Sequence, residues 1–234
     1  MIPAAFEYYR PQDMAGVFAI LQEHGDDARV MAGGHSLIPM MKLRMADVPH
    51  LIDLQDVGGM SDVTIVSHEV RIGAMVTQAD IIDNTELTAV VPILREAALQ
   101  IADPQVRYMG TVGGNIANGD PGNDMPGLMQ CMDATFTLVG PNGERGVQAR
   151  DFYEAAYITA REDDEILTAV TIPLHSGGYA YEKQKRKIGD YATAAAAVQI
   201  TKDNGSCASA AIAMTNLSDT PVYSEAAGVA LVGG

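Results

Sequence analysis

The stretches Ala32–Leu37, AGGHSL, and Thr111–Asn115, TVGGN, are expected to decide the fold of this chain. We expect each to be a loop of small residues in which backbone N–H groups can face an anion without an intervening Cβ. Because they lie far apart in sequence, the fold has to bring them together around a shared ligand. We therefore predict that they hold the diphosphate of one dinucleotide from two sides. Neither follows G-x-G-x-x-G or G-x-x-x-x-G-K-[ST], so Rossmann and P-loop sites are not indicated.

The residues around the first glycine stretch predict a compact unit of helix, strand, loop, helix and strand. Asp13 precedes an amphipathic helix that ends near His24 and Gly25. A strand over residues 28–31 leads into AGGHS, residues 36–45 are expected to be helical, and residues 50–54 form a further strand.

Gly58 and Gly59 mark a joint before the second glycine stretch. After it the pattern predicts a hairpin over residues 63–74, helices over 77–83 and 90–101, and then the glycine stretch itself. The run Ile116–Asp124, IANGDPGND, is too rich in glycine, proline and acids for a regular element, so we expect a functional loop.

The second half of the chain predicts mostly strands. A short helix from Met125 precedes a hairpin around Pro141-Asn142-Gly143, a helix over residues 151–157 and a strand over 165–173. A boundary is expected at residues 175–178. Beyond it, Asp203-Asn204-Gly205 predicts a hairpin between two strands, and residues 224–231 start a helix.

Charge and cysteine content exclude several classes of function. The formal net charge of −15 argues against binding to nucleic acid or to an anionic membrane surface. Cys131 and Cys207 have no metal-ligand spacing, so this chain is expected to hold neither zinc nor an iron–sulfur cluster. No apolar run is long enough to span a bilayer and the N-terminus lacks a signal-peptide pattern, so we expect a cytoplasmic protein.

Three blocks of sequence carry a resemblance to a known family. AGGHSLIPMMKLRMA (32–46), IADPQVRYMGTVGGNIANGDPGNDMPGLMQC (101–131) and YEKQKRKIGDYATAAAA (181–197) resemble the FAD-binding medium subunits of aerobic molybdenum carbon monoxide dehydrogenases, in the xanthine oxidase superfamily. The similarity covers essentially the whole chain. It departs at the end, where family members continue with further helices, so the last domain is expected to be incomplete.

The resemblance implies an α+β fold of three parts. Two α+β subdomains of the PCMH-type FAD-binding fold, residues 1–57 and 58–175, are expected to hold an extended, non-covalent FAD between them. Residues 176–234 would form a C-terminal antiparallel sheet domain. The implied partners are a small subunit with [2Fe-2S] clusters and a large molybdopterin subunit that oxidises CO, in a dimer of heterotrimers. The chain would pass electrons from iron–sulfur to FAD and on to a quinone-type acceptor, with any membrane association made through the partners.

The resemblance also assigns cofactor-binding residues. Asp124 matches an acid beside the ribityl or ribose hydroxyls, and Lys183, with Lys185 as second choice, would stabilise the reduced flavin at its N1–C2=O edge. Tyr191 is a candidate to cover the isoalloxazine ring, with packing in the hairpin as the alternative. The remaining matches are apolar wall positions and the two glycine stretches: Ile101, Leu167; Ala32, Gly33, Gly34, His35, Ser36; Thr111, Val112, Gly113, Gly114, Asn115. None of these residues is expected to be catalytic or to bind a metal.

Three other functions stay open at the level of sequence. The chain could serve another molybdenum hydroxylase, acting on an aldehyde, a purine or an aromatic acid, because the flavin subunit does not contact that substrate. His35 in the GGH stretch also resembles the histidine bonded to the flavin in covalent flavoprotein oxidases. Finally, the chain could be a FAD-binding or assembly module without turnover.

Overall fold

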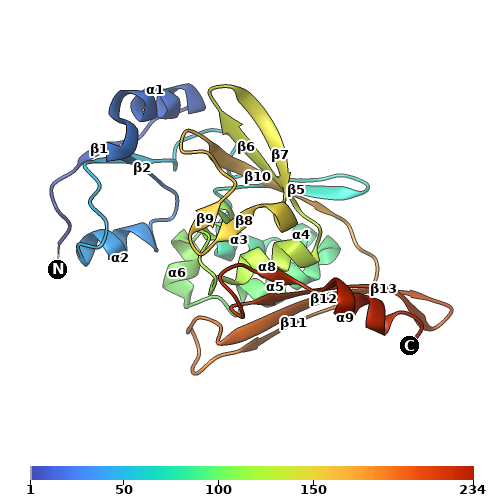
Figure 1. Ribbon diagram of the computed structural model, residues 1–234. Helices are drawn as coiled ribbons and strands as arrows, with labels where there is room; N and C mark the ends of the chain where they lie inside the picture. The colour runs from blue at the N-terminus through green and yellow to red at the C-terminus, as the bar shows by residue number, and fades with distance from the viewer. Residues whose placement is uncertain (1) are drawn as a thin grey trace.

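The computed structural model describes residues 2–234, which form three larger sheets and one two-stranded sheet together with short helices (Figure 1). The main core runs through the three larger sheets, since one cluster of buried side chains extends from Val17 to Ala213. A second, smaller cluster lies at the first sheet and consists of Met31, Met41, Val48 and Leu51. No helix within residues 2–234 has the length and apolar character needed to cross a membrane.

The first sheet is parallel, with strand order β1-β3-β2, and carries the first glycine stretch. Asp13 caps α1 by accepting a hydrogen bond from the Gly16 N–H at 2.8 Å, as its position predicts. The AGGHS turn leaves the carboxyl end of β2, which is the edge of a parallel sheet where ligands bind. The elements are β1 (Glu7–Tyr9), α1 (Met14–His24), β2 (Ala28–Met31), α2 (Leu37–Lys42) and β3 (His50–Asp53).

The second sheet is antiparallel, with strand order β4-β5-β10-β6-β7, and a group of short helices lies beside it. Its strands are β4 (Val63–Ile65), β5 (Glu69–Gly73), β6 (Thr135–Gly140), β7 (Gly143–Gln148) and β10 (Ile166–Pro173). The helices are α3 (Gln78–Asp83), α4 (Thr85–Val90), α5 (Pro92–Ala98), α6 (Pro104–Met109), α7 (Val112–Ala117) and α8 (Asp124–Cys131). A small pair, β8 (Tyr153–Ala155) and β9 (Ile158–Thr159), follows β7.

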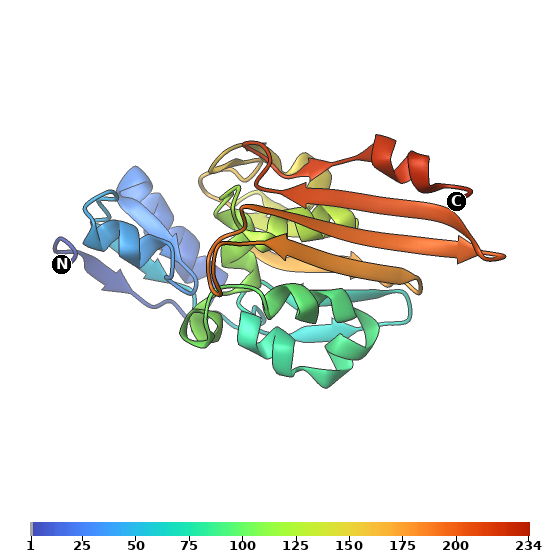
Figure 2. The same cartoon turned by 90° about the horizontal axis from the view of Figure 1, so that it is seen from below.

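The third sheet is antiparallel in the order β11-β12-β13-β14 and is formed by the C-terminal part of the chain. Figure 2 shows its long strands running side by side with the green helices beneath them. Helix α8, buried at every residue, packs against β12 and β13. The elements are β11 (Gly178–Gln184), β12 (Ala194–Asp203), β13 (Ser206–Thr215), β14 (Val222–Tyr223) and α9 (Glu225–Leu231).

Three predicted elements are wrong. The second glycine stretch, expected as a loop, is the first turn of helix α7. The helix expected over residues 151–157 is a 3-10 turn at Ala149–Asp151 followed by strand β8. The loop expected over residues 116–124 begins inside α7 and ends at the first residue of α8, because both helices extend into it. The hairpin at Asp203-Asn204-Gly205 is confirmed, with Asn204 at φ 49° and Gly205 at φ 90°. The predicted α+β class and the antiparallel C-terminal sheet are also confirmed.

Candidate functional site

A cavity of about 580 Å³ lies where the three sheets approach one another, within the usual range for ligand sites of about 300–1,000 Å³. Residues of both glycine stretches line it. The start of β10, with Leu167, and the segment from Lys183 to Tyr191 contribute further wall residues. Segments far apart in sequence therefore share one binding space.

The two glycine stretches meet at this cavity, as the sequence predicts. A Cβ built on Gly33 would lie 1.9 Å from the carbonyl oxygen of Met109 and 3.0 Å from the Cα of Gly110. A Cβ on Gly114 would lie 3.3 Å from the Cβ of Ala32. Only glycine at position 33 lets the first stretch lie directly against the turn that precedes the second.

The first stretch presents unpaired backbone donors. Within residues 2–234, the N–H groups of Gly33, Gly34, His35 and Ser36 make no hydrogen bond to a protein acceptor. Gly34 has φ 73°, a conformation that turns the chain sharply and that L side chains rarely adopt. Successive unpaired N–H groups in a sharp turn form a concave site that favours an anion.

The second stretch differs from the prediction, because it is the first turn of helix α7 rather than a loop. Thr111 caps this helix by accepting a hydrogen bond from the Gly114 N–H at 3.0 Å. The N–H groups of Val112 and Gly113 donate to the carbonyl oxygens of Val76 and Ala74. The expectation of free N–H groups is therefore wrong for Val112 and Gly113, because neighbouring backbone accepts them. Side chains of this stretch are then a further source of donors toward the cavity.

Asn115 supplies such a donor. Its side-chain Oδ1 accepts a hydrogen bond from the Met125 N–H at 3.3 Å. The Nδ2 group of the same amide can therefore donate to a ligand. The backbone carbonyl of Asn115 accepts a hydrogen bond from Asn123 Nδ2 at 2.9 Å. Asn123 is buried and also lines the cavity. The start of α8 thus fixes both the backbone and the side-chain orientation of Asn115.

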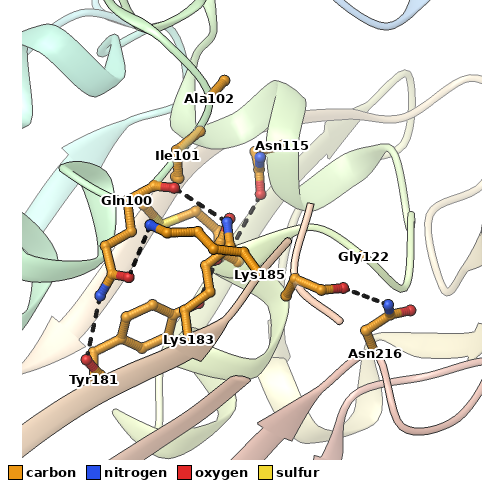
Figure 3. A network of polar contacts seen from close by, with 12 residues as sticks. Gln100, Ile101, Ala102, Asn115, Gly122, Tyr181, Lys183, Lys185 and Asn216 are labelled. Carbon is orange, nitrogen blue, oxygen red and sulfur yellow. Dashed lines mark hydrogen bonds and ion pairs between the residues drawn. The ribbon is translucent and has the colours of Figure 1, made fainter. Parts of the chain in front are cut away.

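A buried polar network joins Asp124 to strand β11. Figure 3 shows its members Gln100, Tyr181 and Lys183. The Lys183 Nζ lies 2.9 Å from Asp124 Oδ2 and donates to the Gln100 carbonyl at 3.1 Å. The Tyr181 hydroxyl donates to Asp124 Oδ1 at 2.5 Å. The side chains of Lys183 and Asp124 are 1 % and 6 % exposed, so water screens this ion pair little. One of the three N–H bonds of the Lys183 ammonium is left for a further acceptor.

Burial governs the ionisation of this network. Burial raises the pKa of Asp124 above its ordinary value of 3.8, and the nearby Lys183 and the Tyr181 hydrogen bond partly offset that rise. Burial, with the Asp124 charge beside it, raises the pKa of Tyr181 far above its ordinary value of 10.0. Tyr181 therefore stays protonated and keeps donating to Asp124.

Most of the other predicted residues also line the cavity, and two do not. Ile101 and Leu167 are 7 % and 5 % exposed and belong to its wall, as does Tyr191. Val112 is fully buried outside the lining. Lys185 is also outside it, and its Nζ donates to Gln100 Oε1 at 3.2 Å. The geometry therefore favours Lys183 over Lys185 as the lysine that faces a ligand.

Several lining residues were not singled out from the sequence: Gln78, Asn123, Arg29 and Arg161. Asn123 lies inside the glycine-rich run Ile116–Asp124, but the sequence alone does not indicate that its side chain is buried at the cavity. The other three lie in ordinary helix, strand or turn sequence that carries no signal. Residues 2–234 contain no group of three or more His, Cys, Asp or Glu side chains that could hold a metal ion.

The cavity suits an extended dinucleotide such as FAD. The unpaired N–H groups at Gly33–Ser36 match the acceptor oxygens of a diphosphate, and the Asn115 amine adds a donor beside them. The Lys183 and Asp124 pair offers a charged contact at a wall formed by another part of the chain. Apolar residues such as Ile101 and Leu167 provide surface for flat rings.

Comparison with known proteins agrees with this interpretation. Residues 4–175 match the family model described as the FAD binding domain in molybdopterin dehydrogenase. Residues 179–234 match the CO dehydrogenase flavoprotein C-terminal domain. The chain is 56 % identical to the carbon monoxide dehydrogenase medium chain of Afipia carboxidovorans, over 100 % of this chain and 82 % of that protein.

Solved structures give the same result. The chain superposes on a chain of a Cu,Mo-CO dehydrogenase in its cyanide-inactivated form with a TM-score of 0.97 at 56 % identity, covering 100 % of this chain and 82 % of that one. Quinoline 2-oxidoreductase from Pseudomonas putida 86 is similar with a TM-score of 0.96 at 32 % identity, with the same coverage. The chain therefore belongs to the family of FAD-binding medium subunits of molybdenum-containing carbon monoxide dehydrogenases.

Proposed function

We propose that the cavity holds FAD with its diphosphate on the first glycine stretch. The observation that carries this assignment is the set of four neighbouring N–H groups, from Gly33 to Ser36, that have no protein acceptor and lie at the cavity wall. Asn115 adds its Nδ2 donor, and Thr111 its hydroxyl, from the other side. Oriented N–H dipoles of this kind can hold a dianion although the chain carries a net charge of −15.

We assign the flavin end of the cofactor to the wall formed by Asp124, Lys183 and Ile101. Lys183 has one N–H bond free to approach the N1–C2=O edge, and a cation there favours the reduced ring. Asp124 holds that ammonium in place and is itself close enough to the cavity to accept from ribityl hydroxyls. Tyr191, which packs beside Gly122 at the same wall, would cover the ring.

As a medium subunit of this family, the chain works in a complex with an iron–sulfur small subunit and a molybdenum-containing large subunit. FAD, when bound, supplies the chemistry that takes up electrons from one-electron centres and releases them as pairs. The residues of this chain bind and orient the cofactor and stabilise its charge. We expect the CO chemistry itself to take place on the large subunit, as in the related carbon monoxide dehydrogenases.

Reduction by CO tests this function. The complex of the chain with its partner subunits should contain about one FAD per chain, and CO should bleach the flavin absorption band. Acid precipitation should release the yellow colour into the supernatant, which would exclude a covalent bond at His35. If neither CO nor dithionite reduced the bound FAD, the electron-transfer role would be wrong and a binding or assembly module would remain.

The substrate, the electron acceptor and the assembly are finer proposals. The 56 % identity to a carbon monoxide dehydrogenase medium chain favours CO over the aldehyde, purine or aromatic substrates of other molybdenum hydroxylases. We expect a quinone-type acceptor, which would bring the complex to a membrane surface through its partners, and a dimer of heterotrimers. Oxygen-free assays with quinone analogues, and the mass of the purified complex in solution, test these two points.

A further inference from the structure

The side-chain amide of Gln78 is buried without a polar partner. Gln78 is the first residue of α3, is 2 % exposed, and neither its Nε2 nor its Oε1 makes a hydrogen bond to protein. Buried amides are nearly always paired, because each unmet donor or acceptor is destabilising. Gln78 is also a lining residue of the cavity described above.

The backbone of Gln78 lies beside the junction of the two glycine stretches. Its N–H donates to the Gly110 carbonyl at 2.9 Å, and the preceding Thr77 forms a bridge with Thr111. Gly110 in turn lies against Gly33. Because Gln78 also lines the cavity, a ligand held at this junction lies beside its side chain.

We propose that Gln78 is a further FAD-binding residue, whose amide pairs with the diphosphate and with a neighbouring sugar hydroxyl of the cofactor. A primary amide carries both a donor and an acceptor. Phosphate oxygens accept from Nε2, and a ribityl or ribose hydroxyl donates to Oε1, so this section of FAD satisfies both unpaired atoms. The inference rests on the proposed position of the diphosphate and adds a residue that is not part of either glycine stretch.

A matched control is available in Gln130. It is also a buried glutamine with an unpaired Oε1, but its Nε2 donates to the Ala149 carbonyl and it does not line the cavity. Removing its amide should change folding stability without changing the affinity for FAD. Comparing FAD affinity between variants of Gln78 and Gln130 therefore distinguishes a buried amide that contacts the ligand from one that does not.

The test compares Gln78→Met and Gln130→Met in the complex with the partner subunits. After FAD is removed and titrated back, we expect Gln78→Met to bind FAD about ten- to a hundredfold more weakly, the usual loss for a hydrogen bond to a charged group. The thermal unfolding midpoint of its FAD-free form should be unchanged or higher, since two unpaired polar atoms have been replaced by apolar ones of similar shape. Gln130→Met should bind FAD like the wild type.

Two outcomes would overturn the inference. Equal FAD affinity in Gln78→Met and wild type would show that the amide makes no contact with the cofactor. Gln78 would instead have a packing role if the FAD-free variant had a lower unfolding midpoint and its weaker FAD binding were fully explained by that loss of stability. If Gln78→Met does not fold, Gln78→Glu serves instead, and its FAD affinity should rise as the pH falls and the carboxyl is protonated. Failure of the wild-type complex to bind any FAD would overturn the proposed function itself.

Discussion

Gly33 is needed both for the packing of the two glycine stretches and for cofactor binding. Adding a Cβ would place it 1.9 Å from the Met109 carbonyl oxygen, far inside van der Waals contact, so the two glycine stretches would have to separate. The unpaired N–H groups of the first stretch would then move away from Asn115 Nδ2, although we propose that both bind the same diphosphate. A single methyl group at this position should therefore damage both packing and cofactor binding.

Gly33→Ala should lower the free energy of unfolding by about 1–3 kcal/mol, the usual cost of overpacking, and reduce the FAD content of the purified protein. Gly58→Ala is the matched control, because a Cβ there meets no atom within 4 Å. Urea unfolding and flavin absorbance per protein measure the two effects. A Gly33→Ala variant as stable and as yellow as Gly58→Ala would show that the contact with Met109 does not constrain the site.

Lys183 and Asp124 form a buried ion pair, so removing either charge leaves the other buried without its partner. Lys183→Met should lower the free energy of unfolding by about 3–5 kcal/mol, because Asp124 would be left as a buried charge with only the Tyr181 hydroxyl to stabilise it. Adding Asp124→Asn to Lys183→Met should restore most of that stability, which a urea titration can measure. Lys185→Met, outside the cavity lining, is the control and should change stability little. Absence of rescue in the double variant would contradict the pairing.

At the scale of residues, prediction from the sequence succeeded where the residue type itself determines the local conformation or contact. The Asp13 cap, the Asn204-Gly205 turn and the approach of the two glycine stretches follow from local chemistry. The free N–H groups expected at Val112 and Gly113 were wrong, because their acceptors, Val76 and Ala74, come from another segment of the chain. Local sequence holds no information about such partners.

At the scale of elements, helix α7 shows why the second glycine stretch was expected to be a loop. Two consecutive glycines disfavour a helix, each by about 1 kcal/mol relative to alanine. Here they are tolerated because α7 crosses closely over another segment: a Cβ on Gly113 would lie 2.4 Å from the Cβ of Ala74. Tertiary packing therefore overrides helix propensity, and only the structure reveals it.

The start of β10 is held by a second ion pair, between Arg145 of β7 and Glu165. Arg145 Nε and one of its terminal nitrogens donate to the two carboxylate oxygens at 2.6 and 2.7 Å. Glu165 also accepts from the Glu162 N–H, so the turn before Ile166 and Leu167 is fixed. This turn forms one end of the cavity.

The stability contributed by Glu165 should depend on pH. The hydrogen bonds from Arg145 lower the pKa of Glu165 below its ordinary value of 4.5, with burial acting in the opposite direction. The folded state therefore binds a proton less readily than the unfolded state, so this contribution is complete above about pH 4.5 and disappears as the pH falls through the lowered pKa. Glu165→Gln should lower the unfolding midpoint at pH 7, and the difference from wild type should shrink below pH 4.5. A difference that stays constant down to acid pH would contradict the ion pair.

At the scale of the whole molecule, the chain joins the three larger sheets through one main core and leaves the cavity between them. The order of sheets could be expected from the resemblance, but the presence of β11 at the same cavity as the glycine stretches depends on long-range packing of α8 against β12 and β13. Gln78 is held at the cavity by the hydrogen bond from its N–H to the Gly110 carbonyl, and Asn123 by the one from its side chain to the Asn115 carbonyl. Their roles could not be read from periodicity or motif.

The electrostatics of the whole molecule lead to a last prediction. The chain carries a formal charge of −15, and its cavity is lined by the basic residues Arg29, Arg161 and Lys183 together with five carboxylates. The long-range field therefore repels dianionic FAD, while the unpaired N–H groups of the first glycine stretch attract it only at short range. Salt screens the repulsion and leaves the short-range contacts intact.

The association rate of FAD with the FAD-free chain should therefore rise several-fold from about 10 mM to about 0.15 M salt, as the Debye length falls from about 30 Å to about 8 Å. Stopped-flow quenching of flavin fluorescence measures this rate. Asp163→Asn removes one carboxylate that lines the cavity and that forms no salt bridge within residues 2–234, so it should raise the rate at low salt and flatten the salt dependence. If instead the rate fell with added salt, basic side chains would be attracting the diphosphate, and the assignment of its binding to the N–H groups of Gly33–Ser36 would be wrong.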